Sequence, residues 1–425
     1  MTRVFCGPKE FIPDERDESV EYVSMYEHDG LTGVSTVGTG LVKAINDAGI
    51  MAGARSWDFL SLALAVNAAD NVLERAPSAD GWTRQIELEV VMYEPQPFQA
   101  VARELETALR FLTGDFWKLT FAEGGYPPPR PKQVIIRAAD CVCLLSGGLD
   151  SLIGALDLTA HGKQPLLVSQ VARGDSEKQT KFAHRLGADD RHLQWNQNIR
   201  PKVEDIEGST RGRSIGFFAF AALAADHLAQ TVASPVDVFV PENGLISLNV
   251  PLNAGRVGSL STKTTHPVFM ERLQSIWTAL GIPAVLRLPY AALTKGEMLA
   301  GCVDQGALAP LASESTSCGR FIRNGYMHCG RCVPCLVRRA SFIRAGQEDR
   351  TVYKHALLKE AQPDYEPNDV GAVAAAVVKV EQWGIRDFTA GQMSFAATHQ
   401  RLDFEGVVGR GLAELGTLLR QQRIL

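Results

Sequence analysis

The chain has 425 residues, of which 45% are hydrophobic, 21% charged and 8% aromatic. This composition is that of a folded globular protein, and it excludes a disordered chain, a coiled coil and a collagen-like fibre. With 43 basic and 48 acidic residues the formal net charge is −5, which disfavours a dedicated nucleic-acid-binding protein. At roughly 150 residues per domain, the length predicts two or three domains.

Neither a membrane segment nor a secretion signal is expected. The longest apolar run, residues 215–223, is shorter than the ~18 residues of a membrane-spanning helix and is followed by Asp226 and His227. The first six residues are followed by Gly7, Pro8 and charged residues, so the apolar core of a signal peptide is missing. We therefore expect a cytoplasmic protein with no membrane partner.

The first region, residues 1–131, has mixed character. Residues 61–74 and 98–112 predict amphipathic helices, and residues 86–92 predict a strand. A proline-rich stretch at 126–131 predicts a linker or boundary. We expect an α+β domain of unknown role.

The middle region, residues 132–348, alternates short β-branched runs with helical runs. Strands are predicted at 141–145, 165–170, 192–195, 236–240 and 284–288. Helices are predicted to begin at Asp150, Ser176, Arg213, Pro267 and Thr294. Because parallel neighbours need crossover connections, this alternation predicts an α/β domain with a parallel sheet covered on both faces. Ligands of such sheets bind at the carboxyl ends of the strands. The last region, residues 349–425, is predicted to be helical, with helices at 370–383 and 411–420.

A glycine pair joins the first strand of the middle region to its helix. The string is Ser146-Gly147-Gly148-Leu149-Asp150-Ser151. Adjacent glycines let the backbone approach an anion closely and adopt positive φ. The helix start adds free N–H groups and its positive dipole end. A tight β–α turn with a serine cap would account for two glycines alone, but the whole string is more specific and predicts phosphate binding. It is not a Walker A loop, because Gly-x-x-x-x-Gly-Lys-Ser/Thr is absent.

Two other glycine pairs are weaker signals. Gly38-Thr39-Gly40 and Gly409-Arg410-Gly411 each begin a Gly-x-Gly pattern without a third glycine or a clear preceding strand. We expect both in turns.

Half of the eight cysteines are clustered in residues 318–335. They are Cys318, Cys329, Cys332 and Cys335. Four thiolates at such spacing can close a tetrahedral structural zinc site. An iron–sulfur cluster is the alternative, although Arg339 stands where ferredoxin-type runs have their fourth cysteine. His328 is expected at the surface or in support of a ligand. The remaining cysteines are expected to be small buried hydrophobic residues: Cys6, Cys141, Cys143 and Cys302.

The glycine string and the cysteine cluster, in this order, resemble the 7-cyano-7-deazaguanine synthase (QueC) family, whose glycine string is the PP-loop of ATP pyrophosphatases. The resemblance spans about residues 133–345, half of the chain. Further segments that carry it are Arg211-Gly212-Arg213-Ser214, Thr294-Lys295-Gly296-Glu297, Thr316-Ser317-Cys318 and Arg338. It implies a Rossmann-like core of the adenine nucleotide alpha hydrolase type with a four-cysteine zinc segment.

The resemblance also implies an activity. A 7-deazaguanine carboxylate attacks the α-phosphate of ATP, which is bound with Mg, pyrophosphate leaves, and ammonia traps the adenylate as an amide. A second activation dehydrates the amide to a nitrile. Residues 146–151 would bind ATP or pyrophosphate. Asp150, Arg213 and Lys295 are the catalytic candidates, the two cations as charge neutralisers; the alternative for each cation is a solvated or ion-paired side chain.

The sequence departs from the family at positions around the expected substrate. Leu149 stands where the family commonly has glutamine, Ser214 where it has asparagine, and residues 169–174 replace an Asp-Tyr-Gly-Gln run. A long loop from Glu242 to Pro267, dense in hydroxyl and amide groups, is unlike the short enzyme and is expected to shape the acceptor pocket, or else to form a polar rim.

Together with the added terminal regions, these departures resemble the longer QueC-like proteins of anti-phage systems, such as the QatC proteins of the Qat system. One hypothesis is that an amine on a partner protein, in place of ammonia, traps the activated carboxylate.

Two other functions stay open. An RNA-thiolating PP-loop enzyme is favoured by a basic strip, although the acidic balance of the chain opposes it. The strip consists of Arg331, Arg338, Arg339 and Arg344. A non-catalytic nucleotide-binding subunit is disfavoured by the intact string at 146–151.

Overall fold

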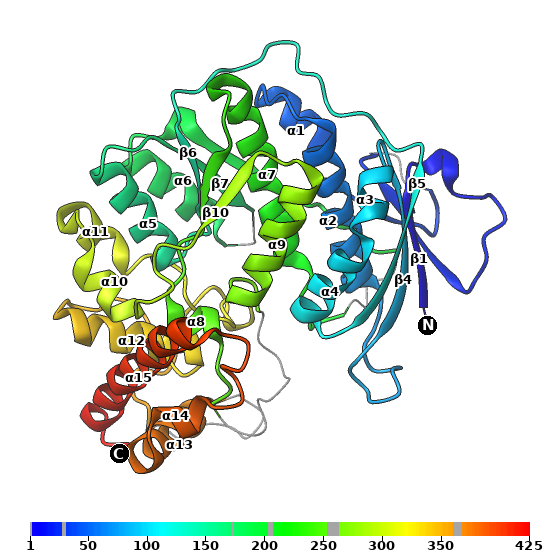
Figure 1. Ribbon diagram of the computed structural model, residues 1–425. Coiled ribbons are helices and arrows are strands. Elements are labelled where there is room, and N and C mark those ends of the chain that lie inside the picture. The colour runs from blue at the N-terminus through cyan, green and yellow to red at the C-terminus, as the bar shows by residue number, and fades with distance from the viewer. Residues whose placement is uncertain (1, 28–30, 172–173, 203–206, 253–262, 360–367) are drawn as a thin grey trace.

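The computed structural model describes residues 2–27, 31–171, 174–202, 207–252, 263–359 and 368–425 (Figure 1). Within these residues the chain forms two five-stranded sheets, whose strands alternate with helices along the chain, and a helical C-terminal part. Every strand pair in both sheets is parallel. The predicted α/β class is therefore confirmed.

The first sheet belongs to the N-terminal third of the chain. Its strands are β1 (Thr2–Gly7), β2 (Val20–Met25), β3 (Ser35–Val37), β4 (Gln85–Met92) and β5 (Phe116–Glu123), in the order β3-β2-β1-β4-β5. Its helices are α1 (Leu41–Asp47), α2 (Ala54–Val72), α3 (Gln96–Ala100) and α4 (Ala102–Thr113).

The mixed helix and strand content predicted for this region is present, but its sheet is parallel throughout. One face of the sheet packs on α2 and α4, whereas the opposite face carries polar groups such as the exposed Lys118–Glu87 ion pair (2.8 Å). Parallel sheets are usually buried on both faces and give continuous apolar strands. Because this one is buried on one face only, β5 alternates buried and exposed residues, and its sequence does not indicate a parallel sheet.

The second sheet lies in the middle of the chain. Its strands are β6 (Cys141–Leu144), β7 (Pro165–Gln170), β8 (His192–Trp195), β9 (Val236–Phe239) and β10 (Ala284–Arg287), in the order β10-β9-β6-β7-β8. Its helices are α5 (Leu149–Ala160), α6 (Ser176–Arg185), α7 (Arg213–Val232), α8 (Gly244–Leu248), α9 (Pro267–Leu280), α10 (Lys295–Gly301), α11 (Gln305–Ala312) and α12 (Val333–Ala345). All five predicted strands are found, within one residue at their ends.

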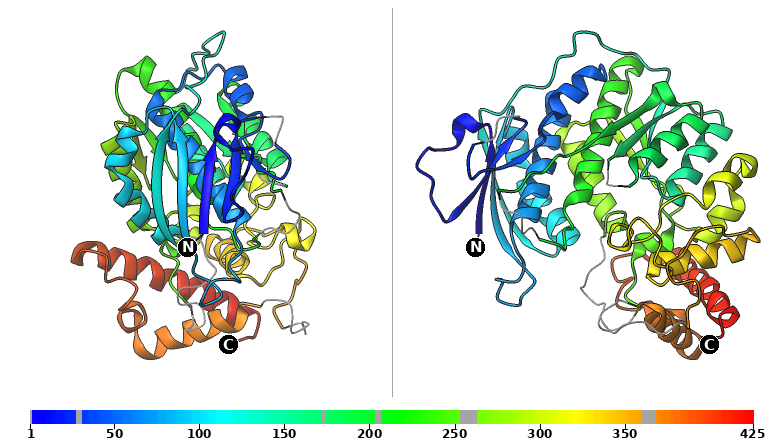
Figure 2. Two further views of the ribbon diagram at one scale, coloured as in Figure 1. Left: turned by 90° about the vertical axis from the view of Figure 1, so that its right-hand side faces the viewer. Right: turned by 180° about the vertical axis from the view of Figure 1, so that it is seen from behind.

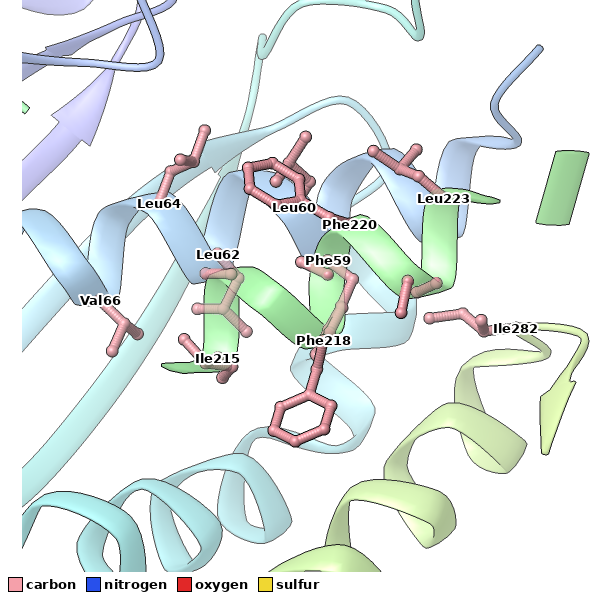
Figure 3. Close-up of a cluster of buried hydrophobic side chains, with 14 of the residues drawn as sticks. Phe59, Leu60, Leu62, Leu64, Val66, Ile215, Phe218, Phe220, Leu223 and Ile282 are labelled. Atoms are coloured by element: carbon pink, nitrogen blue, oxygen red, sulfur yellow. The ribbon is translucent and has the colours of Figure 1, made fainter. Parts of the chain in front are cut away.

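The two sheets share one hydrophobic core, which α2 and α7 form between them. Figure 3 shows Phe59, Leu60 and Leu62 of α2 facing the apolar side chains of α7. The α7 residues that the figure labels are Ile215, Phe218, Phe220 and Leu223. The segment between β5 and β6 crosses from one sheet to the other along the top of the molecule in Figure 1. The two sheets are therefore packed together, and are not merely joined by that segment.

No segment of membrane-spanning length is expected from the sequence, but helix α7 is long and apolar enough, by length and composition alone, to cross a membrane. In the described part of the chain it is the one helix that passes this test, and 67% of its apolar window is buried inside the protein. A core helix passes the same test.

The C-terminal part consists of α13 (Val370–Trp383), α14 (Ile385–Thr389) and α15 (Thr398–Gln421), drawn in orange and red in Figure 2. The prediction of a turn at Gly409-Arg410-Gly411 is wrong, because these residues lie inside α15. Gly411 allows close packing there: a Cβ at this position would lie 2.6 Å from Cδ2 of Leu245 on α8, so the Leu245 side chain would have to shift. The four cysteines outside the cluster are buried, as predicted.

Candidate functional site

The carboxyl edge of the second sheet has a point at which neighbouring connections diverge. β6 lies at the centre; the chain continues to β7 and β8 on one side, and later to β9 and β10 on the other. Parallel sheets bind ligands at such a switch point, where two adjacent strands send their loops in opposite directions. The loop after β6 is the predicted phosphate loop, and the segment after β9 is residues 242–244.

The loop after β6 is a tight turn shaped by its glycines. Gly147 has φ +89°, in the left-handed region. At Gly148 a Cβ would lie 3.2 Å from the Thr316 carbonyl oxygen, so the chain passes close by. The exposed Ser146 accepts a hydrogen bond at Oγ from Gly148 N–H (3.2 Å) and lies 3.1 Å from Oγ of the buried Ser151. Leu149 is fully buried in the core, so only its backbone faces the edge. The turn presents Ser146 and the start of α5 to an anion.

Asp150 is buried directly behind this loop and is held by protein groups. One carboxylate oxygen accepts from Lys295 Nζ, and the other accepts from Asn243 N (3.1 Å) and Nδ2 (2.7 Å). Burial opposes ionisation of Asp150, but Lys295 and the hydrogen bonds from Glu242 and Asn243 lower its pKa to about 2. Burial and the neighbouring Asp150 raise the pKa of Glu242 well above its usual value. Asp150 thus ties the loop after β6 to the segment after β9.

Lys295 reaches this network from the first turn of α10. The turn is fixed by a capping box, in which the Thr294 hydroxyl accepts from Glu297 N–H (3.0 Å) and Glu297 accepts from Thr294 N–H (2.9 Å). Lys295 itself is 6% exposed and paired with Asp150. The structure therefore brings together Asp150 and Lys295, two of the three predicted catalytic residues.

Arg213, the third, lies elsewhere on the same edge, at the first position of α7. Its residue as a whole is exposed, but the surrounding protein lowers the pKa of the Arg213 guanidinium, and the charge of nearby Asp175 opposes that lowering. Asp175 in turn borders the glycine turn, since a Cβ on Gly147 would lie 3.6 Å from Asp175 Cβ. Arg213 is thus linked to the phosphate loop only through the charge of Asp175, and no hydrogen bond joins its side chain to that loop among the described residues.

A further cation beside the loop was not predicted from the sequence. Lys178 Nζ donates to Thr316 Oγ1 (2.6 Å) and lies 4.1 Å from the centre of the Phe321 ring, while Thr316 N–H donates to the Gly147 carbonyl (2.9 Å). Burial lowers the pKa of Lys178 and raises that of Asp175. Both residues come soon after β7 in the chain, so the predicted strand order already implies that they lie at the carboxyl edge of the sheet.

The four clustered cysteines form a compact, buried set of sulfur atoms. All four Sγ atoms lie within 4.8 Å of one another, and the Cys318–Cys332 and Cys329–Cys335 separations are both 3.9 Å. Thiolates 2.3 Å from a tetrahedral zinc ion would be about 3.8 Å apart. Four backbone N–H groups donate to Cys318 and Cys329, as suits thiolate ligands. The set can hold a single zinc ion, and it is too compact for several iron and sulfide ions between the sulfurs.

The cysteine segment also supports the phosphate loop. Arg338 on α12 donates to Ser315 Oγ (2.9 Å), Ser317 Oγ (3.1 Å) and the Ala312 carbonyl (2.6 Å), and so fixes the residues on either side of Thr316. Through Thr316 this support reaches Gly147. A metal at the cysteines would therefore order one wall of the loop as well as its own segment.

The basic strip expected from the sequence does not exist as a surface. Arg331 and Arg338 are completely buried, and the Arg339 guanidinium donates to the Ala356 carbonyl (2.7 Å). His328 does not lie at the surface, which was one of the two positions expected for it. It is buried, and its Nε2 accepts from Ser317 N–H (3.1 Å). Of the four arginines only Arg344 is exposed, so they do not form a continuous basic surface for RNA.

The long polar segment from Glu242 to Pro267 contains helix α8 as well as loop. Its residues 253–262, which include Ser261 and Thr262, lie outside the described residues, as do 172 and 173 after β7. Near its end His266 caps α9 by accepting from Val268 N–H, and its ring lies 5.0 Å from Phe111 and 4.8 Å from Phe395. The N-terminal and C-terminal regions both contact the segment at this residue.

Comparison with known proteins agrees with the resemblance over half of the chain. No protein-family model matches. The 7-cyano-7-deazaguanine synthase of Methanothrix thermoacetophila is 27% identical over 229 residues, which cover 50% of this chain and 98% of the relative. That of Anaeromyxobacter dehalogenans is 28% identical over 241 residues, 51% of this chain and 96% of the relative.

The 7-cyano-7-deazaguanine synthase 1 of Mesorhizobium japonicum is 36% identical over 95 residues, 21% of this chain and 38% of the relative. Since half of this chain matches nearly all of the first two relatives, its other half has no counterpart in them. The chain is thus similar, over about half its length, to proteins named 7-cyano-7-deazaguanine synthase.

Proposed function

We propose that the protein uses ATP to activate a 7-deazaguanine carboxylate as an adenylate and converts it to the amide or the nitrile. The observation that carries this proposal is the glycine turn at the switch point of the second sheet, with Lys178, Lys295 and Arg213 around it. The names of the relatives support the substrate class.

The chemistry asks for positioning and charge neutralisation. A carboxylate oxygen attacks the α-phosphorus, the bond from that phosphorus to the bridging oxygen breaks, and pyrophosphate leaves. Residues 146–151 would hold the departing phosphates with backbone N–H groups and the Ser146 hydroxyl. Lys178 and Arg213 would neutralise the charge that develops on them. Lys295 would act by keeping Asp150 and the Asn243 segment in place.

A carboxylate is also available for the magnesium ion that accompanies ATP. Asp175 Oδ1 has no hydrogen-bond partner among the described residues, and the residue borders Gly147. An oxygen of this kind suits magnesium, which binds phosphates together with one or two carboxylates. Asp175 would hold the ion against the phosphates. The zinc would play a structural role at the four cysteines.

The proposal is tested by pyrophosphate release from ATP with 7-carboxy-7-deazaguanine, with ammonia present or omitted. Release that requires the carboxylate supports it, and Ser146→Ala should slow that release. Lys181→Ala is the control, because Lys181 forms an exposed ion pair with Glu314 and has no hydrogen bond or ion pair with residues 146–151 among the described residues. ATP binding without pyrophosphate release would instead support a non-catalytic nucleotide-binding subunit.

We further propose that the acceptor is an amine on a partner protein, in an anti-phage system. The support is indirect: the segment from Glu242 to Pro267 departs from the short enzymes, and two added regions contact it at His266. In this reaction the amine nitrogen attacks the adenylate carbonyl, AMP leaves, and a stable amide forms. Incubation with ATP, the carboxylate and the products of neighbouring genes should give a partner of higher mass. If ammonia is consumed and no partner gains mass, the acceptor is ammonia.

A further inference from the structure

A buried ionic cluster lies where the N-terminal region meets the start of α7. Asp115 accepts from Arg75 (2.9 and 3.0 Å) and from Arg84 (2.7 Å), and Asp70 pairs with Arg84 and, at 3.5 Å, with Arg75. All four side chains are at most 4% exposed. These two arginines and two aspartates balance each other in charge, and such fully paired groups are the usual form of buried charge.

Arg211 lies next to this cluster without a carboxylate of its own. The second oxygen of Asp70 accepts from the backbone N–H groups of Arg211 and Gly212 (both 2.5 Å), not from the Arg211 side chain. The guanidinium lies 4.7 Å from the Trp82 ring centre, and its Nη1 has one long contact, 3.5 Å, to the Thr113 carbonyl. The side chain is thus held in place by stacking and by its neighbours.

The remaining edge of the Arg211 guanidinium has no partner. Arg211 is 6% exposed, and its Nε and Nη2 make no hydrogen bond to any described residue. Nε–H and Nη2–H are parallel donors, the fork that binds both oxygens of a carboxylate or two oxygens of a phosphate. Buried donors are rarely left unpaired, because each loses its bonds to water without replacement.

A second cation reinforces the same place. Lys263 Nζ lies 4.5 Å from the centre of the Phe111 ring on α4. Burial lowers the pKa of Lys263, and the positive charge of nearby Arg211 lowers it further. No described carboxylate pairs with Lys263. Glu207 also faces the cluster, but its carboxylate accepts from backbone N–H groups of Arg75 (2.9 Å) and Ser209 (2.6 Å). Among the described residues no carboxylate forms an ion pair or hydrogen bond with the side chain of Arg211 or Lys263, although Asp115 and Asp70 lie near enough to Arg211 to influence its pKa.

We propose that Arg211 and Lys263 form a binding site for an oxyanion, a carboxylate or phosphate group of a ligand, separate from the phosphate loop. The Nε/Nη2 edge of Arg211 binds two oxygens of this group, and Lys263 adds charge. The site combines residues of the second sheet's domain with Trp82 and Phe111 of the N-terminal region. Arg211 lies two residues before Arg213, the first residue of α7.

The test is calorimetric titration of the full chain with inorganic phosphate and, separately, with acetate, at constant ionic strength. A non-hydrolysable ATP analogue with a methylene group between the α- and β-phosphorus atoms is present to occupy the phosphate loop. We expect one anion site per chain. Arg211→Lys keeps the charge but loses the parallel fork, and it should weaken binding at least tenfold. Lys263→Met should also weaken it. Arg350→Lys, an exposed arginine paired with Glu348, is the control and should change nothing.

Stability without any added anion gives an independent readout. Arg211→Met should not lower the melting temperature in anion-poor buffer, since it removes an unpaired buried charge, and it should abolish the stabilisation that phosphate or acetate gives the natural protein. Stronger binding of phosphate than of acetate would identify a phosphate ligand, and the reverse a carboxylate. The proposal is overturned if neither anion binds, or if Arg211→Lys binds both as tightly as the natural protein does.

Discussion

Replacing Lys295 by methionine would leave the Asp150 carboxylate buried beside Asn243 without its cation. In the natural protein the pKa of Asp150 is lowered from 3.8 to about 2 against the opposing effect of burial. A lowering of this size corresponds to about 2 kcal/mol in favour of the ionised form. Removing one partner of a buried pair typically costs about 3–5 kcal/mol, because the other charge is left uncompensated. We expect Lys295→Met to lower the free energy of unfolding by an amount in that range.

The assay is urea unfolding at pH 7 of the natural protein, Lys295→Met, Asp150→Asn and the double variant. Each single change leaves one buried group unpaired, whereas the double change removes both. The loss in free energy of unfolding in the double variant should therefore be smaller than the sum of the two single losses by at least about 2 kcal/mol. Lys181→Met is the matched control; it breaks an exposed pair and should cost at most about 1 kcal/mol.

The dependence on pH has a defined sign. Since the pKa of Asp150 is lower in the folded state, its stabilisation is present above the unfolded value near 3.9 and is lost as pH falls toward 2. The stability difference between the natural protein and Asp150→Asn should therefore shrink over that interval. Additive losses in the double variant, or a difference that does not change with pH, would refute the reasoning.

Three further outcomes are expected. Lys178→Ala should slow pyrophosphate release about 10- to 100-fold with an unchanged circular dichroism spectrum, and a normal rate would remove Lys178 from the phosphate site. Metal analysis should find one zinc per chain, and Cys332→Ser should lose it and lower the melting temperature; full zinc content in that variant would contradict the four-cysteine site. Burial and Lys263 lower the pKa of His266 to about 4, below the 6.5 of the unfolded chain, so stability should fall as pH drops from 6.5 to 4, by up to about 3 kcal/mol. Urea titrations at pH 7 and 4.5 should show a smaller loss in His266→Asn, whose side chain can still cap α9, than in the natural protein; the buried His192 and His328, whose pKa values are also lowered, contribute equally to both.

The second sheet could be predicted because its sequence pattern and its burial agree. Strands such as β7 are buried along their whole length and give continuous apolar runs, and helices such as α9 begin at a proline with a capping side chain before it. The first sheet could not be predicted in the same way. β3 has only three residues, and β5 alternates because one face of its sheet carries polar side chains.

At the site, local strings were informative and long-range contacts were not. The turn at Gly147 and the four cysteines are contiguous enough for their spacing to indicate chemistry. The partners of Asp150 are 93 and 145 residues away along the chain, and Lys178 meets Thr316 across 138 residues. The unpaired edge of Arg211 has no signal in the sequence at all, because it arises from which neighbours are missing. Likewise, Arg331 and Arg338 of the expected basic strip could not be recognised as buried, since their acceptors are carbonyls and hydroxyls of other segments.

The shared packing of α2 and α7 limits how this protein can be shortened. A version trimmed to the length of its smaller relatives would lose α2 and expose Phe218, Phe220 and Leu223 to water. An exposed apolar helix face of this kind favours association between molecules or aggregation. A shortened protein would therefore need polar residues on that face of α7, or a second molecule that covers it in place of α2. The first third of the chain therefore covers an apolar face of α7 that would otherwise be exposed.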